Sequence, residues 1–89
     1  MQRRCTQRLR EEVGAILLHD WDPLGVRHVA GAANEYDGYV ETICQMLVDG
    51  ADVRKLGDHL HRLESDAMGL SSPTENAQVV ANRLRMLVR

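Results

Sequence analysis

The chain has 89 residues, enough for one small domain and too few for a second hydrophobic core. Eleven basic residues stand against 13 acidic ones, which gives a net charge of -2, and a pI near 6.0 argues against a general nucleic-acid-coating protein. Hydrophobic residues make up 44 % of the chain, yet there is no Phe, one Trp and two Tyr. Since aromatic residues are typical of strands, this aliphatic composition favours packed helices, and we expect a single helical domain over residues 1–89.

The two cysteines, Cys5 and Cys44, fit neither a disulfide framework nor a zinc site in number or spacing, so we expect two reduced thiols. The start of the chain is basic, like that of a signal peptide, but the apolar run after it covers only residues 15–18. A secretory signal needs about 7–15 apolar residues and a membrane span about 20. We therefore expect a cytoplasmic protein that does not insert into membranes.

The first two predicted helices are separated by a long connection. The first helix runs from about residue 4 to residue 19 and ends where Asp22-Pro23 disfavours helical geometry. An ordered connection over residues 20–33 comes next. The second helix runs from about residue 35 to residue 49, with Asn34 as its cap, Asp37 three residues further on, and Gly50 as its stop. The apolar stripe of the first helix is Leu9, Val13, Ile16 and Leu17. The apolar stripe of the second helix is Tyr36, Tyr39, Val40, Ile43 and Leu47.

The third and fourth predicted helices come after short connections. Asp52 caps the third helix, which Gly69 ends, and Ser72-Pro73 begins the fourth. Short connections favour antiparallel neighbours, so we predict a small all-α, up-down bundle of four helices with a longer ordered loop between the first and second. The apolar stripe of the third helix is Val53, Leu56, Leu60, Leu63 and Ala67. The apolar stripe of the fourth helix is Ala77, Val80, Ala81, Leu84, Leu87 and Val88.

This topology predicts a basic pole where the first helix begins and the fourth ends. Seven of the eleven basic residues would lie there: Arg3, Arg4, Arg8, Arg10, Arg83, Arg85 and Arg89. Terminal arginines are usually solvated, and those at a helix C-terminus favour its dipole. A polyanion site would use the same residues, but no aromatic residue interleaves with them to stack on bases. Nucleic-acid association is therefore the weakest functional hypothesis.

The opposite pole combines all three aromatic residues with carboxylates. Trp21 could plug the end of the bundle, with the neighbouring carboxylates acting as caps. Alternatively, the aromatic rings and carboxylates could bind a cation or a basic partner segment, because ring faces attract ammonium and guanidinium groups. With Glu64 added, the candidate binding residues are Trp21, Asp22, Glu35, Tyr36, Asp37, Tyr39 and Glu64.

The chain contains residue types that can catalyse reactions or bind metals, but their spacing matches no known catalytic or metal-binding motif. His59 and His61 lie two residues apart on a predicted helix and point away from each other, and neither His19 nor His28 has a metal-ligand spacing. The chain contains no phosphate-binding glycine loop, no nucleophile elbow and no His-Glu-x-x-His motif. We therefore predict no metal site, no cofactor and no catalytic residue.

Three segments, within a span from about residue 10 to residue 88, resemble a family of small bacterial all-helical proteins. That family is built around a Trp-Asp-Pro-x-Gly-Ile/Val stretch and has no assigned function, so the resemblance implies a helical fold without an established activity. Residues 27–33 depart from the family's more polar, proline-containing turn. The matching segments are Trp21-Asp22-Pro23-Leu24-Gly25-Val26, Glu35-Tyr36-Asp37-Gly38-Tyr39, and Glu64 with Met68-Gly69-Leu70.

These features support two main functional hypotheses. The first is a non-enzymatic protein-interaction or regulatory module, for example a toxin-neutralising one, whose acidic aromatic pole binds a basic protein partner. The second is a small enzyme or ligand binder, which requires the carboxylates of Asp22, Glu35, Asp37 and Glu64 to converge in one pocket. Because a core of this size gives only modest stability, the sequence also allows a homodimer.

Overall fold

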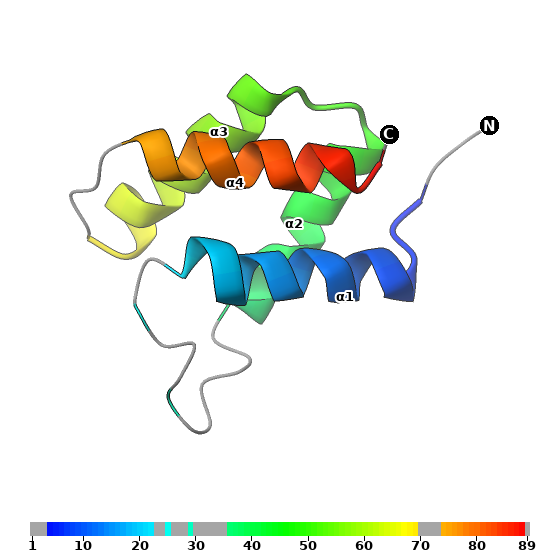
Figure 1. Ribbon diagram of the computed structural model, residues 1–89, viewed down its shortest axis with the longest axis horizontal. Coiled ribbons are helices and arrows are strands. Elements are labelled where there is room, and N and C mark those ends of the chain that lie inside the picture. Colours follow the sequence, from blue (N-terminus) through cyan, green and yellow to red (C-terminus); the bar gives the residue numbers. More distant parts are fainter. Residues whose placement is uncertain (1–3, 23–24, 26–28, 30–35, 70–73, 89) are drawn as a thin grey trace.

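The computed structural model describes residues 4–22, 25, 29, 36–69 and 74–88, and every regular element in that part of the chain is helical. Four α-helices succeed one another in alternating directions (Figure 1): α1 (Gln7–Ile16), α2 (Asp37–Val48), α3 (Val53–Arg62) and α4 (Thr74–Met86). The predicted all-α bundle, with its longest connection between the first two helices, is confirmed. No helix among these residues is both long enough and apolar enough to cross a bilayer.

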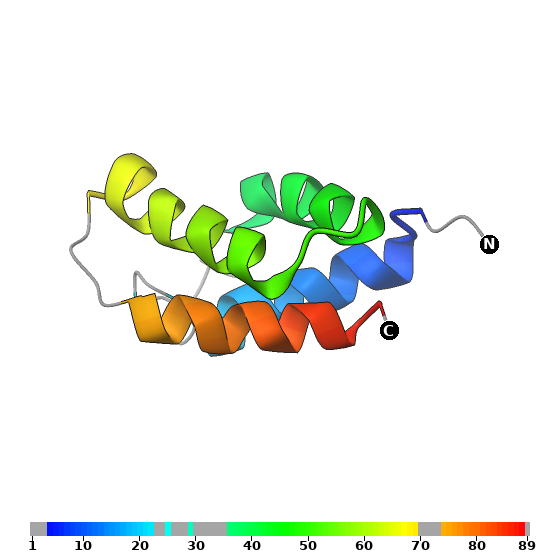
Figure 2. The same cartoon turned by 90° about the horizontal axis from the view of Figure 1, so that it is seen from above.

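The helices pack mainly as two antiparallel pairs, α1 with α2 and α3 with α4. In Figure 2, α2 and α3 form the upper layer of the molecule, and α1 and α4 form the lower one. The start of α1 and the end of α4 lie at the same end of the molecule (Figures 1 and 2). This is the end at which the topology predicts the basic pole, although Arg3 and Arg89 lie outside the described residues.

Each helix buries the apolar stripe that its spacing predicts. Burial of a Val, Leu or Ile side chain contributes about 1.5–3 kcal/mol relative to leaving it exposed, so these stripes provide most of the stabilisation of the fold. Leu9, Ile16, Val53, Leu63 and Leu87 pack against the core from its rim. The largest fully buried aliphatic side chains are Val13, Leu17, Ile43, Leu47, Leu56, Leu60, Val80 and Leu84.

Two helix starts differ from the prediction. The first helix begins after Thr6, whose hydroxyl accepts a hydrogen bond from the backbone N–H of Leu9 at 3.1 Å and so caps α1. α2 begins at Asp37, two residues later than predicted, and the residue at its cap position, Tyr36, makes no side-chain cap bond. The predicted caps Asn34 and Ser72 lie outside the described residues.

The connection between α2 and α3 is a tight turn made by three consecutive residues with different roles. Gly50 adopts a φ of +88°, and its N–H donates to the Leu47 carbonyl at 3.1 Å, while the Ala51 N–H donates to the Met46 carbonyl at 2.9 Å. This pattern is a Schellman motif, which satisfies the carbonyls at the end of a helix. Asp52 then caps α3, as predicted, by accepting a hydrogen bond from the Lys55 N–H at 2.8 Å.

We predict that Gly50→Ala lowers the free energy of unfolding by about 1–2 kcal/mol, because the left-handed backbone is costly for any residue with a Cβ. Gly38→Ala is the matched control: Gly38 is exposed within α2, has no positive φ and has no atom within contact distance of an added Cβ. Alanine at that position should leave stability unchanged or raise it by up to about 1 kcal/mol. Urea denaturation measures both, and equal effects of the two substitutions would contradict the role of Gly50.

Candidate functional site

α1 and α3 both continue into a wide π-helical turn at the same end of the bundle. These turns are η1 (Leu17–Trp21) and η2 (Leu63–Ala67). They are closed by backbone hydrogen bonds over five residues, from the Asp22 N–H to the Leu17 carbonyl at 2.9 Å and from the Met68 N–H to the Leu63 carbonyl at 3.1 Å. Since π-helical turns change the direction of the side chains relative to an α-helix, they decide where the residues at the helix ends point.

The two wide turns are joined by a buried hydrogen bond. Trp21 Nε1 donates to Glu64 Oε2 at 2.8 Å, and these side chains are only 2 % and 3 % exposed. A carboxylate buried in this way is costly unless it accepts hydrogen bonds. Asn76 of α4 adds a long hydrogen bond, 3.5 Å, from its Nδ2 to the Trp21 carbonyl. The side chain of Trp21 therefore connects the α1–α2 pair to the α3–α4 pair.

Trp21 is also the centre of an aromatic cluster that holds the start of α2. Its ring centroid lies 5.4 Å from that of Tyr36, in a tilted arrangement, and 6.2 Å from that of Tyr39, edge to face. Both geometries are favourable for aromatic pairs. The Tyr36 hydroxyl donates to Asp22 Oδ1 at 2.7 Å, and Asp22 leaves η1 with a φ of +31°, a left-handed conformation that Asp tolerates better than most residues.

The structure joins four of the predicted site residues in one cluster at the end of the bundle. Trp21, Asp22, Tyr36 and Glu64 bond or stack with one another, as expected if the tryptophan plugs the end of the bundle. With 2 % of its surface exposed, Trp21 presents no ring face to an incoming cation. Tyr39 is half-buried at the edge of the cluster, Asp37 is exposed, and Glu35 lies outside the described residues.

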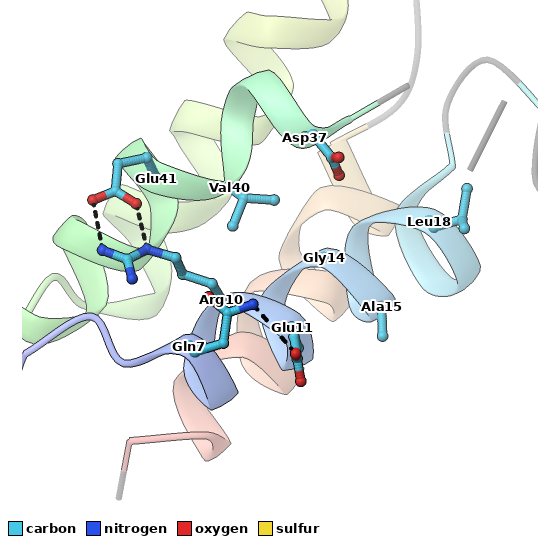
Figure 3. Close-up of a pocket in the computed structure, with 9 residues that line it drawn as sticks. All are labelled: Gln7, Arg10, Glu11, Gly14, Ala15, Leu18, Asp37, Val40 and Glu41. Atoms are coloured by element: carbon cyan, nitrogen blue, oxygen red, sulfur yellow. Dashed lines mark hydrogen bonds and ion pairs between the residues drawn. The ribbon is translucent and has the colours of Figure 1, made fainter. Parts of the chain in front are cut away.

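Asp37 belongs to a groove between α1 and α2 (Figure 3). The groove has a volume of about 460 Å³. The two helices approach each other at Gly14 and Val40, where a Cβ added to the glycine would lie 3.7 Å from Val40 Cγ2. The lining combines apolar residues, Leu18 and Val40 among them, with polar ones. The lining residues are Gln7, Arg10, Glu11, Gly14, Ala15, Leu18, Asp37, Val40 and Glu41.

The polar lining of this groove is predominantly acidic. Arg10 reaches across from α1 and donates to both carboxylate oxygens of Glu41, from Nε at 2.7 Å and from Nη2 at 3.2 Å (Figure 3). These hydrogen bonds lower the pKa of Glu41 and raise that of Arg10. Among the described residues, neither Glu11 nor Asp37 forms an ion pair with a basic residue, and α2 contains no basic residue to offset them. The groove therefore carries unbalanced negative charge.

The sequence analysis did not predict the pairing of Arg10 with Glu41 or the burial of Glu64. Arg10 was expected to join the basic pole, but its side chain turns to α2 because Glu41 offers a carboxylate that a guanidinium can bind through two parallel hydrogen bonds. The burial of Glu64 had one sequence signal: it lies four residues after Leu60 and eight after Leu56, on the apolar stripe of α3. A carboxylate in that position requires a buried donor, and Trp21 supplies one.

The histidines and acids of the described residues show no metal-binding arrangement. No three side chains of His, Cys, Asp or Glu in that part of the chain come together in a way that could hold a metal ion, and His28 lies outside it. The carboxylates named in the enzyme hypothesis are also separated. Asp37 lines the groove, whereas Glu64 is buried against Trp21 and is not among the groove residues.

We predict that Trp21→Phe destabilises the fold by about 3 kcal/mol, because it keeps a ring but leaves the Glu64 carboxylate buried without its donor. Tyr39→Phe is the control: it removes a polar atom from the same cluster without breaking that hydrogen bond. Glu64→Gln, which retains an acceptor oxygen, should cost about 1 kcal/mol. Chemical denaturation compares the three variants, and equal losses for Trp21→Phe and Tyr39→Phe would contradict the role of the Trp21–Glu64 bond.

A second prediction concerns His59 in α3. Partial burial lowers its pKa below the ordinary 6.5, and the positive charge of Arg62 acts in the same direction. The folded chain therefore holds His59 neutral while the unfolded chain takes up a proton near pH 6.5, so the free energy of unfolding should fall as pH drops below that value. His59→Gln should reduce this fall between pH 7.5 and pH 5.5 in urea denaturation. An unchanged pH dependence in the variant would show that other groups cause it.

Comparisons with protein-family models, with curated proteins and with solved structures found no match for this chain. A role for the protein must therefore be inferred from its own residues. Those residues offer two distinct features, a buried cluster around Trp21 that fixes the helix ends and an open acidic groove between α1 and α2.

Proposed function

We propose that the chain is a protein-interaction module that binds a basic segment of a partner protein in the acidic groove between α1 and α2. The observation that carries this proposal is the charge of the groove lining. It contains three carboxylates, those of Glu11, Asp37 and Glu41, against one basic residue, Arg10, which is already engaged by Glu41. The proposed recognition surface lies beside the acidic aromatic pole rather than on its rings.

Charge of this kind favours a lysine- or arginine-rich partner for two physical reasons. Opposite charges steer the partner toward the groove and raise the rate of association, and like charges disfavour acidic competitors. The groove also offers apolar surface from Leu18 and Val40 beside small residues, Gly14 and Ala15. Lysine and arginine side chains can lay their methylene stems on such a surface while their charged ends reach carboxylates.

The buried aromatic cluster has a supporting role in this proposal. Leu18 lies in η1 with Trp21, and Asp37 comes directly after Tyr36. Each of these two groove residues is therefore close in the chain to one of the two aromatic residues whose rings pack together. Packing of Trp21 on Tyr36 therefore holds one end of the groove in shape. The Trp-Asp-Pro resemblance adds no activity, and the proposal does not depend on it.

The alternatives receive less support from the geometry. The enzyme hypothesis needs converging carboxylates, but the described ones are divided between the Trp21 cluster and the groove. The nucleic-acid hypothesis loses two of the arginines on which it depends, because Arg8 pairs with Glu12 at 3.2 Å and Arg10 pairs with Glu41 at 2.7 Å. A toxin-neutralising or other regulatory activity is compatible with the proposal, because it would require binding to a basic partner surface and no catalysis.

We predict that a short lysine-rich peptide, titrated into the isotopically labelled protein, shifts the backbone amide resonances of residues that line the groove. A glutamate-rich peptide of the same length should not. Replacing two lining carboxylates, in Glu11→Gln/Asp37→Asn, should weaken binding of the lysine-rich peptide by about three- to tenfold, because each exposed charge pair contributes about 0.2–1 kcal/mol. Added salt should weaken wild-type binding in the same way.

The matched control removes two exposed carboxylates from the other helix pair, in Asp66→Asn/Glu75→Gln. It should bind the lysine-rich peptide almost as tightly as the wild type. Equal weakening in both double variants, or shifts centred outside the α1–α2 face, would contradict the proposal. A search for the natural partner should likewise compare the wild type with Glu11→Lys/Asp37→Lys, because a Trp21 variant would disturb the fold as well as any binding.

A further inference from the structure

The last helix, α4, carries apolar side chains on two opposite sides. Val79 and Met86 lie seven residues apart, which is close to two full turns, so they share one face of the helix. That face points roughly away from the side that packs in the core. Val79 is 52 % exposed on it and Met86 is 62 % exposed. The side packed in the core comprises Ala77, Val80, Ala81 and Leu84.

This second apolar side distinguishes α4 from the other helices. Within the described ranges, α1, α2 and α3 expose no large apolar side chain, and Val29 of the α1–α2 connection is the one such residue outside α4. Single exposed apolar residues are common on protein surfaces and need no explanation. Two of them at helical spacing on one face, along the lower edge of the molecule in Figure 2, form a stripe that could pack against another helix.

Two opposite charges flank this stripe. Glu75 precedes Val79 by four residues and Arg83 follows it by four, so both neighbour it on the helix surface. Both charged side chains are exposed, and neither forms an ion pair with another residue that the structure describes. They are about 12 Å apart along the helix axis, which is too far for them to pair with each other. The face therefore presents an acid, an apolar residue and a base in a symmetrical order.

We propose that this face of α4 packs against the same face of a second copy of the chain, with the two helices antiparallel about a two-fold axis beside Val79. The axis places Val79 against its own counterpart and Glu75 of each copy opposite Arg83 of the other, which forms two equivalent ion pairs. Met86, three residues beyond Arg83, would lie against the beginning of the other copy's α4.

A second copy fits this face better than a partner of a single charge. A basic segment would match Glu75 and meet repulsion from Arg83, and an acidic segment would do the reverse. Only a surface with both charges in the opposite order satisfies both residues, and an antiparallel copy of α4 has that order. The inference is independent of the proposed function, because no residue that lines the acidic groove belongs to α4.

The size of the face determines how tightly the two copies should bind. α4 has 13 residues and is therefore about 20 Å long. A contact made mainly by one helix from each copy buries less than the roughly 800 Å² per partner of a standard interface. We therefore expect a weak, reversible dimer that forms at high protein concentration and that added salt weakens.

Sedimentation equilibrium of the full chain in reducing buffer, from about 10 µM to about 1 mM, tests the proposal. The mass of the wild type should rise from 10.0 kDa toward twice that value as concentration increases. Val79→Glu should raise the dissociation constant at least about tenfold, because two carboxylates would then meet at the axis of an apolar contact. Since Val79 is exposed, its urea midpoint should stay close to that of the wild type.

Two charge reversals test the antiparallel register itself. Arg83→Glu alone, or Glu75→Arg alone, places like charges at both ion-pair positions and should weaken the dimer at least about fivefold. An equimolar mixture of these two variants should associate again, because each one supplies the charge that the other lacks. Lys55→Glu, the same reversal at an exposed residue of α3, is the matched control and should dimerise like the wild type.

The proposal fails if the wild type stays monomeric over the whole concentration range, a result that needs no variant. It also fails if Val79→Glu dimerises as readily as the wild type, because the two copies would then meet through another surface. A mixture of Arg83→Glu and Glu75→Arg that associates no better than either variant alone would contradict the two-fold register. Equal weakening by Lys55→Glu would show that net charge, rather than the α4 face, controls association.

Discussion

The arrangement of this small domain depends on one buried hydrogen bond, from Trp21 to Glu64. An unpaired carboxylate in an aliphatic core would be strongly destabilising, so Glu64 can be buried only where a donor meets it. The indole N–H meets this requirement only when the side chains of η1 and η2 reach each other, which aligns the α1–α2 pair with the α3–α4 pair. Leucines packing on leucines are non-directional and would not select one such alignment. The hydrogen bond between Trp21 and Glu64 thus specifies how the α1–α2 pair packs on the α3–α4 pair.

This constraint connects the interior of the molecule to its surface. Trp21 stacks on Tyr36, and Tyr36 in turn bonds Asp22, so the same cluster sets where α2 begins relative to η1. α1 and α2 approach each other at Gly14 and Val40, and the acidic groove lies along this contact. The aromatic cluster and the acidic groove therefore have separate roles in the structure. The aromatic residues shape the site from within, and the exposed carboxylates give it its charge.

Local patterns predicted most of the fold. Apolar spacing located the helices, and Gly50 and Asp52 marked the turn after α2, because caps and stripes depend on neighbours within a few residues. The site was less predictable, because its contacts are distant in sequence. Helical spacing puts Trp21 and Glu64 on the inner faces of their helices, but no residue near either one in the sequence indicates that the two side chains meet. Arg10 likewise has a partner, Glu41, that only the packing of α1 on α2 reveals.

The most direct test of this account is hydrogen–deuterium exchange at the Trp21 indole, monitored by the NMR signal of its Nε1–H. If the bond to Glu64 joins the two helix pairs, that hydrogen should exchange only when the whole domain unfolds, and its protection should match that of the core amides of α2 and α4. Exchange at a rate close to that of a free indole, while those core amides remain protected, would contradict the account. It would show that the domain is held together without the Trp21–Glu64 bond.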